Sequence, residues 1–306
     1  MNIRPTVSIV MCTYNGAMFL EQQLQSLVHQ TYLIQEVLVF DDASTDGTPD
    51  IVKKFIEHYD YIKLTINPKN IGFNKNFEQA VRAASGDVIA FCDQDDFWVS
   101  TKIEKMIQAW KPEYPLIYCG ALSFNKMVPQ NTSLHPLYRQ FEGTDARKIF
   151  LRNTVSGHAL LIKKDFLSQV LPFNPNVMYD WMMAVTAAYN GGVQFYPEVL
   201  VFQREHTNNA TLQSGKNLTV TEQQRAFKLQ AIAHLHAFTQ ITGIPPNHKF
   251  FAQNLADLLV ESIRHTFYFP LFTFLLQQRV ILFNYKKRKI GFFSHFKHSF
   301  KTTRNE

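Results

Sequence analysis

The strongest constraint on the fold of this chain is the regular alternation of short apolar runs and amphipathic segments over its first 125 residues. Apolar strands separated by helical segments of about 10–15 residues are typical of βαβ units, in which a helix connects two parallel strands. We expect strands at Val7–Met11, Glu36–Phe40, Ile62–Ile66 and Val88–Cys92, and helices at Phe19–Gln30, Thr48–His58 and Asn74–Ala84. The pattern predicts an α/β fold with a mostly parallel sheet flanked by helices.

The rest of the chain is irregular as far as residue 219 and helical beyond it. The pattern therefore predicts a main domain over residues 1–219 and a helical C-terminal appendage over residues 220–306. The expected elements are strands at Leu116–Phe124 and within Val193–Phe202, and helices at Tyr179–Tyr189, Glu222–Thr242 and Phe250–His265.

Composition excludes several classes of protein. With 46% hydrophobic and 18% charged residues, the chain can bury a large core and is not globally disordered. The apolar stretch Thr266–Phe283 is interrupted by proline, glutamine and arginine, so it does not predict a bilayer-spanning helix. The N-terminus has too short an apolar run for a secretory signal. The three cysteines have no paired spacing, which argues against a disulfide scaffold and indicates a reducing cytoplasm.

The positive charge belongs to the tail. Residues 284–306 have seven basic residues and one acidic residue, so their net charge is +6. The net charge of the whole chain is also +6, so the net charge of residues 1–283 is zero. We therefore expect no nucleic-acid partner. Phe292, Phe296 and Phe300 recur every four residues among lysines, as on one face of a helix. We expect residues 266–306 to lie on an anionic membrane surface. The alternative is a helix packed on the main domain with a solvated basic end.

Two acidic clusters follow predicted strands, Asp41-Asp42 and Asp93–Asp96. Ligands of open α/β sheets bind beyond the carboxyl ends of the strands. Three carboxylates within Asp93–Asp96 repel one another unless a cation joins them, and oxygen ligands suit Mg²⁺ or Mn²⁺, which in turn binds phosphate oxygens. The alternative is a solvated acidic turn. Glycine-rich dinucleotide and P-loop motifs are absent from the sequence.

The order and spacing of four motifs resemble the family 2 glycosyltransferases. The motifs are Val7–Gly16, Val37–Asp42 with Ser44–Thr48, Asn70-Ile71-Gly72, and Asp93-Gln94-Asp95-Asp96. Together with Tyr179-Asp180-Trp181 and Gln203–Asn209, the last motif is similar to the bacterial rhamnosyltransferase-like branch. The resemblance implies the GT-A fold, a Rossmann-like domain that transfers a sugar from a nucleotide diphosphate donor. It further implies that residues 1–110 bind the nucleotide sugar and residues 111–219 the acceptor.

The resemblance also implies roles for single residues. Asp42 would accept the N3–H of uracil or thymine, and Tyr14 would stack near the base. Asp93 and Asp95 match the DXD signature, so Mn²⁺ or Mg²⁺ would be held by Asp95, Asp93 and His206, with Asp96 acting through water. The implied contacts to the nucleotide sugar are Thr13, Tyr14, Asn15, Asp42, Asn70, Lys75, Asn76, Asp93 and Trp181.

Asp180 matches the position of the catalytic base, which removes the proton of the acceptor hydroxyl. A helix-capping carboxylate is the alternative for Asp180, and a core aromatic is the alternative for Trp181. His206 is either a metal ligand or a surface histidine. His158 either faces the acceptor or is buried with its hydrogen bonds satisfied.

These observations lead to one functional hypothesis. We expect a metal-dependent, inverting glycosyltransferase that moves a sugar from a dTDP- or UDP-linked donor to a glycan or lipid-linked acceptor in bacterial surface polysaccharide or lipooligosaccharide synthesis. The expected location is the cytoplasm, at the inner face of the cell membrane. The alternatives are a catalytically silent nucleotide-sugar-binding or scaffold protein of the same fold, and a nucleotidyltransferase.

Overall fold

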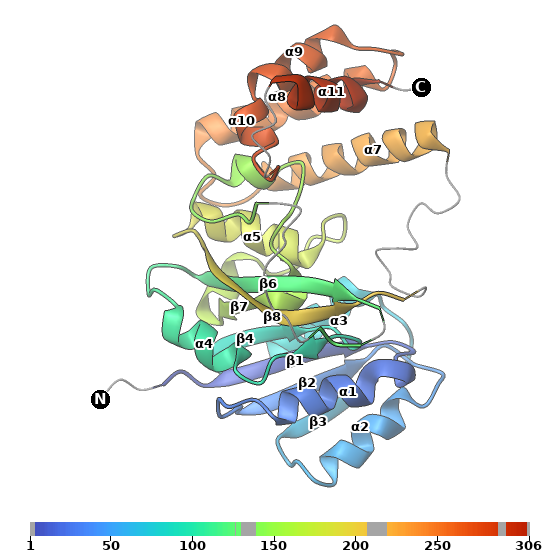
Figure 1. Cartoon of the computed structure of the whole chain (residues 1–306), viewed down its shortest axis with the longest axis vertical. Coiled ribbons are helices and arrows are strands. Elements are labelled where there is room, and N and C mark those ends of the chain that lie inside the picture. Colours follow the sequence, from blue (N-terminus) through green and yellow to red (C-terminus); the bar gives the residue numbers. More distant parts are fainter. Residues whose placement is uncertain (1–3, 126, 130–138, 207–218, 287–291, 305–306) are drawn as a thin grey trace.

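A computed structural model describes residues 4–125, 127–129, 139–206, 219–286 and 292–304. Its central element is an eight-stranded sheet with the strand order β3-β2-β1-β4-β7-β6-β8-β5 (Figure 1). The strands are β1 (Val7–Thr13), β2 (Glu36–Asp41), β3 (Ile62–Ile66), β4 (Val88–Cys92), β5 (Phe97–Trp98), β6 (Leu116–Phe124), β7 (Leu160–Lys163) and β8 (Val193–Arg204).

The first four strands are parallel, as the alternating pattern predicts. The second half of the sheet is mixed: β7 runs antiparallel to β4 and β6, β8 runs parallel to β6, and β5 runs antiparallel to β8. The antiparallel strands follow irregular connections rather than single crossover helices, so the sequence pattern does not reveal their direction.

Helices cover both faces of the sheet because successive residues of the strands point to opposite sides. Ile9 of β1 belongs to the core under α1 (Ala17–Val28), α2 (Thr48–Ile56) and α4 (Lys102–Ala109). Val10 belongs to the larger core under α3 (Phe73–Ala83) and α5 (Tyr179–Tyr189). Three short 3₁₀ helices flank β7 in the chain: η1 (Ala146–Ile149) and η2 (Gly157–Ala159) precede it, and η3 (Asp165–Gln169) follows it.

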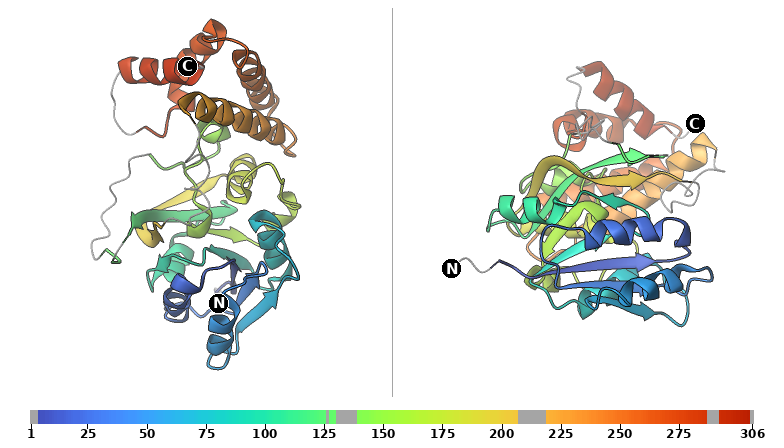
Figure 2. Two further views of the ribbon diagram at one scale, coloured as in Figure 1. Left: turned by 90° about the vertical axis from the view of Figure 1, so that its right-hand side faces the viewer. Right: turned by 60° about the horizontal axis from the view of Figure 1, so that its bottom comes forward.

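The expected helical C-terminal appendage is present and stacks beyond α5 at one end of the molecule (Figures 1 and 2). Trp181 of α5 contacts His234, with ring centroids 4.5 Å apart, and Phe238 packs on Phe150. The appendage thus extends the core of one sheet face. Among the described helices, none is both long and apolar enough to cross a bilayer. The helices are α7 (Val220–Phe238), α8 (Pro246–Ser262), α9 (Phe269–Gln277), α10 (Arg279–Leu282) and α11 (Phe292–Thr303).

Glu36 at the start of β2 connects β2 by hydrogen bonds to the beginnings of β1, β3 and β4. Its carboxylate accepts hydrogen bonds from Ser8 of β1, from Ser85 before β4 and from Lys63 of β3. Burial raises the pKa of Glu36, but these hydrogen bonds outweigh burial and lower the pKa to about 2. The ionised form is therefore the one that the folded chain stabilises.

We expect Glu36→Gln to lower the free energy of unfolding by about 2 kcal/mol at pH 7, measured by urea denaturation. The folded pKa lies below the unfolded value, so this contribution is complete above about pH 4.5 and disappears as the pH falls towards 2. The difference between variant and wild type should therefore shrink at pH 3. Glu21→Gln at an exposed position is the control. Equal differences at both pH values would contradict the assignment.

Candidate functional site

The candidate site lies where β1, β2 and β4 end side by side. Thr13 at the end of β1 pairs with Asp41 at the end of β2, and Met11 of β1 pairs with Cys92, the last residue of β4. The loops that follow these strands therefore emerge at one edge of the sheet, with Tyr14, Asp42 and Asp93 as their first residues. The two acidic clusters are brought together, as expected for parallel strands.

The loops after β1 and β2 are tied to each other. Asp41 accepts hydrogen bonds from the hydroxyls of Thr13 and Ser44. The backbone N–H of Asn15 donates to Ser44 Oγ, and Asn15 Oδ1 accepts the N–H of Thr45, both at 2.8 Å. Asn15 has a φ of 47°, a conformation that asparagine tolerates better than most residues. The side chains of Thr13 and Asn15 thus hold the loops in place.

Asp42 organises the neighbouring Asn70–Gly72 segment. Its buried carboxylate accepts the N–H groups of Ile71 and Gly72 and the amide of Asn67. Asn76 is also buried, and its amide joins Asn67 Nδ2 to the carbonyl of Phe40.

The other predicted donor contacts of this region lie at the surface. Asn70 is exposed and accepts the N–H of Gly72, and Lys75 is exposed. Tyr14 is 48% exposed, which leaves its ring accessible to a ligand.

Gln94 joins the loop after β4 to the loop after β1. Its side-chain amide accepts the N–H of Tyr14 at 2.9 Å and donates to the carbonyl of Tyr14 at 3.1 Å. A Cβ on Gly16 would lie only 2.2 Å from Gln94 Oε1, so a larger residue here would push the Gln94 amide away from Tyr14. The role of Gln94 is not readable from the sequence, because an amide between two aspartates has no distinctive pattern.

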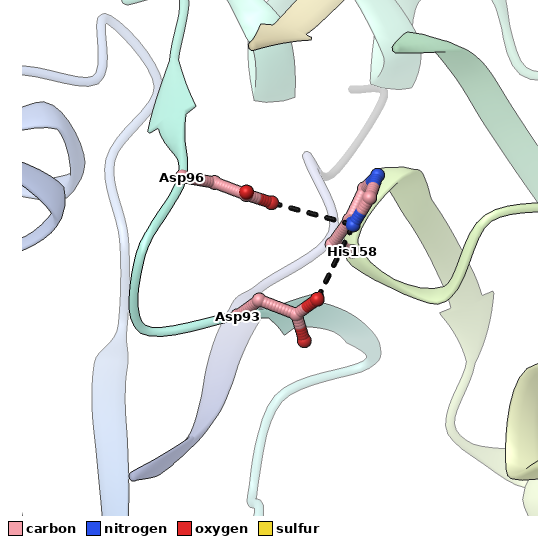
Figure 3. Close-up of side chains that lie close together, drawn as sticks. All are labelled: Asp93, Asp96 and His158. Carbon is pink, nitrogen blue, oxygen red and sulfur yellow. Dashed lines mark hydrogen bonds and ion pairs between the residues drawn. The ribbon is translucent and has the colours of Figure 1, made fainter. Parts of the chain in front are cut away.

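Two acid–histidine contacts surround Asp93. His206 Nε2 lies 2.7 Å from Asp95 Oδ2. His158 Nδ1 lies 3.2 Å from Asp93 Oδ2 and 3.3 Å from Asp96 Oδ2 (Figure 3). Asp93, Asp96 and His158 form one group whose ligand atoms all lie within 4.8 Å of one another. Thr207, Asn208 and Asn209, the end of the predicted Gln203–Asn209 segment, lie outside the described residues.

The two contacts differ in burial and charge. The side chains of Asp95 and His206 are 15% and 18% exposed, whereas those of Asp96 and His158 are 1% and 6% exposed. Burial and the charge of Asp93 raise the pKa of Asp95, although His206 opposes them. Burial alone would lower the pKa of His158, but Asp96 and Asp93 outweigh it and raise the pKa. The two acids thus favour the charged form of His158, whereas burial raises the pKa of Asp96 itself to about 7.

Asp180 at the start of α5 faces the same cluster. It accepts the N–H of Gly157 at 3.2 Å and that of Trp181 at 2.7 Å. Burial raises the pKa of Asp180 to about 6, and the charge of Asp93 adds to the effect. A carboxylate with that pKa is ionised at neutral pH and is a stronger base than an ordinary aspartate. Trp181 points away, since its indole N–H donates to Ile149 and its ring packs on His234.

The comparisons with known proteins bear on this arrangement. Residues 8–171 match the family described as Glycosyl transferase family 2. The chain belongs to the family 2 glycosyltransferases. It is 27% identical over 209 residues to Rv1520, an uncharacterized protein of Mycobacterium tuberculosis, a match that covers 66% of this chain and 59% of that protein. The chain thus spans less than two thirds of the length of this relative.

Two solved structures are similar in fold. TarS 1-349 of S. aureus in complex with UDP-GlcNAc matches with a TM-score of 0.58 and 15% identity over 97% of this chain and 90% of that chain. The mannosyltransferase PcManGT of Pyrobaculum calidifontis, in complex with GDP-Man and Mn²⁺, matches with a TM-score of 0.58 and 17% identity. The match covers 98% of this chain and 86% of that chain. These likenesses confirm the expected GT-A fold.

The polar groups of this family 2 glycosyltransferase fit a divalent cation. Asp93, Asp95 and Asp96 place carboxylates in one loop, His206 places a ring nitrogen beside Asp95, and His158 would offer its Nδ1 after losing its proton. Carboxylate oxygens with one imidazole nitrogen suit Mn²⁺ and Mg²⁺. The structure brings Asp93 together with Asp96 and His158, whereas the predicted set of Asp93, Asp95 and His206 does not form such a group among the described residues. Asp93 belongs to both sets, and His206 contacts Asp95 alone of the three acids in this loop. The sequence alone leaves the role of His158 open, because its contacts with the acids arise only when η2 packs against the loop after β4.

Proposed function

We propose that this chain is a metal-dependent, inverting glycosyltransferase. It transfers a sugar from a dTDP- or UDP-linked donor to a hydroxyl of a glycan or lipid-linked acceptor in bacterial surface polysaccharide or lipooligosaccharide synthesis. The observation that carries the proposal is the gathering of acid–histidine pairs at the sheet edge, with His206 beside Asp95 and His158 beside Asp93 and Asp96. The charge of Asp93 also acts on Asp180. Solved structures of the same fold contain nucleotide sugars, which supports a donor of this class.

Asp95 and His206, with Asp93, would hold the cation. Their side chains are exposed enough to be reached from solvent, whereas Asp96 and His158 are nearly fully buried behind them. The bound cation would offset the negative charge that develops on the leaving diphosphate. Tyr14 lines the base pocket with its exposed ring, and Asp42 keeps a lone pair beyond its three internal hydrogen bonds for the base N3–H.

Asp180 supplies the base. Its raised pKa suits removal of a proton from the acceptor hydroxyl while the diphosphate departs, and the N–H groups of Gly157 and Trp181 fix the direction of its carboxylate. The two acids therefore have different surroundings and different roles: Asp95 is beside a histidine, whereas Asp180 is beside backbone amides.

The first test concerns the cation. Mn²⁺ binding, followed by electron paramagnetic resonance of the free ion, should weaken about 10- to 100-fold in Asp95→Asn and in His206→Gln, because each removes one ligand. EDTA should abolish turnover of a panel of UDP- and dTDP-sugars by the wild type, and Mn²⁺ should restore it. Asp46→Asn, an acid of the neighbouring loop, is the control. Unchanged Mn²⁺ affinity in both ligand variants would exclude this metal set.

The second test concerns the base. Asp180→Asn should retain Mn²⁺-dependent binding of the nucleotide and lose transfer by about 10²-fold or more. The wild-type rate should fall as the pH drops below about 6, because protonation of Asp180 removes the base. Rates measured between pH 5 and 8 in the presence of a saturating donor test this. Full transfer by the variant, or a rate independent of pH over this range, would assign the base elsewhere.

The C-terminal helices contain an aromatic surface to which we assign the proposed membrane contact. Ring contacts of 5.1–6.3 Å join five phenylalanines of α9, α11 and the segment before α9 into an aromatic cluster. Three members of the cluster stay solvent-accessible, with exposures of 65%, 40% and 41% for Phe269, Phe296 and Phe300. The cluster consists of Phe267, Phe269, Phe272, Phe296 and Phe300.

The charges around the aromatic cluster favour an anionic partner. Lys297, Lys301 and Arg304 are exposed on α11 and directly after it. From Ser262 to Asn305 the chain has nine Lys and Arg residues and no Asp or Glu. Of these, Lys287, Arg288 and Lys289 lie outside the described residues. Accessible aromatic rings with adjacent cations suit the interface of an anionic bilayer, so we propose that this face lies on the inner surface of the cell membrane.

Vesicle sedimentation tests this placement. The wild type should bind phosphatidylglycerol vesicles and not phosphatidylcholine vesicles. Phe296→Ser/Phe300→Ser and Lys297→Glu/Lys301→Glu should each reduce binding at least about tenfold, because the first pair removes apolar contact and the second reverses two charges. Phe250→Ser on α8, which changes a phenylalanine that is 73% exposed outside the cluster, is the control. Binding that neither pair alters, or a dimer that the phenylalanine pair dissociates, would contradict the membrane placement.

A further inference from the structure

Lys102 is a buried cation to which the proposed reaction gives no role. It is the first residue of α4, and none of its surface is exposed. Lysine is almost never fully buried unless its ammonium group has partners. Lys102 Nζ donates to the carbonyl oxygen of His158 at 2.9 Å and lies 3.1 Å from the centre of the Trp98 ring. Burial lowers the pKa of Lys102 to about 8, so most of the ammonium remains charged at neutral pH.

The carbonyl that Lys102 holds belongs to η2, a turn of three residues that touches both halves of the site. The side chain of His158 faces Asp93 and Asp96, and the N–H of the preceding residue, Gly157, donates to Asp180. A shift of this turn would therefore move the imidazolium away from the acids and the amide away from the base. The metal-side acids and the base are linked through two adjacent residues of one turn.

Packing on the other side of η2 leaves little freedom. A Cβ at Gly157 would lie 2.5 Å from the hydroxyl of Tyr179 and 3.2 Å from Cβ of Asp180, so the turn is already in close contact with the start of α5. Lys102 approaches the same turn from α4, a helix on the opposite sheet face. The turn is held between α5 and the ammonium.

We propose that Lys102 is a positioning residue for the transfer reaction: its ammonium fixes η2, and η2 sets the position of Asp93 relative to Asp180. The inference rests on the proposed function, since it assigns Asp93 to the metal side and Asp180 to the base. Lys102 itself touches no substrate. It acts through the His158 carbonyl and the neighbouring Gly157 amide.

The test compares two lysines of α4. Lys102→Met keeps the aliphatic stem and removes the ammonium, and Lys102→Gln keeps an N–H donor without the charge. Lys105→Met is the matched control, since Lys105 lies on the same helix and pairs with Glu198 at the surface. The measurements are the unfolding temperature, hydrogen exchange of peptides covering residues 154–160, and Mn²⁺ affinity by electron paramagnetic resonance.

We expect Lys102→Met to accelerate exchange in residues 154–160 more than in β1 and β2 and to weaken Mn²⁺ binding about tenfold. Lys102→Gln should recover part of both losses, and Lys105→Met should show neither. A uniform rise in exchange that follows a lower unfolding temperature in both Lys102 variants, or unchanged exchange at residues 154–160, would overturn the proposal. The exchange readout requires no metal or donor, so a wild type that binds no Mn²⁺ would reject the proposed metal site and leave this test intact.

Discussion

The arrangement of the site depends on how closely packed carboxylates are neutralised. Asp93, Asp95, Asp96 and Asp180 gather where the strands end, and like charges at such distances destabilise the folded chain unless each has a partner. The chain supplies an imidazole to Asp95, an imidazolium to Asp93 and Asp96, and backbone amides to Asp180. These partners come from three separate segments: the end of β8, the turn η2 and the start of α5. The site is thus complete only when the second half of the sheet is in place beside the first.

Arg204 shows how the same need organises the end of β8. Its backbone N–H donates to Asp96, and its Nε donates to the carbonyl of Asp95 at 3.2 Å. Its guanidinium lies between the rings of Phe19 and Phe124, at 4.7 and 4.5 Å from their centroids. Arg204 therefore anchors the acidic loop to the strand that leads to His206.

Much of the fold is readable from the sequence because the parallel strands have near-continuous apolar runs. The boundaries of β3, β4, β6 and the helix α5 agree with the predicted ranges to the residue. The direction of β7 is not readable, because a four-residue apolar run looks the same in either orientation. The same limit applies to the site. Motif order locates Asp42, Asp93, Asp95 and Asp180, but nothing local to residue 102 distinguishes the buried Lys102 from Lys105, which is half-buried three residues later.

The two hydrogen bonds between the Gln94 amide and the Tyr14 backbone would limit how the nucleotide preference can be altered. These bonds join the backbone of Tyr14 to the loop that contains Asp93 and Asp95. Gly16 lies directly against the Gln94 side chain, so the Gln94 amide is closely packed as well. Reshaping the proposed base site around Tyr14 would displace Asp93 and Asp95, the proposed cation ligands, by the same movement. Variants selected for a new donor should therefore arise first at side chains outside these two joined loops, such as the accessible face of the Asn70–Lys75 segment, where recognition can change without disturbing the chemistry.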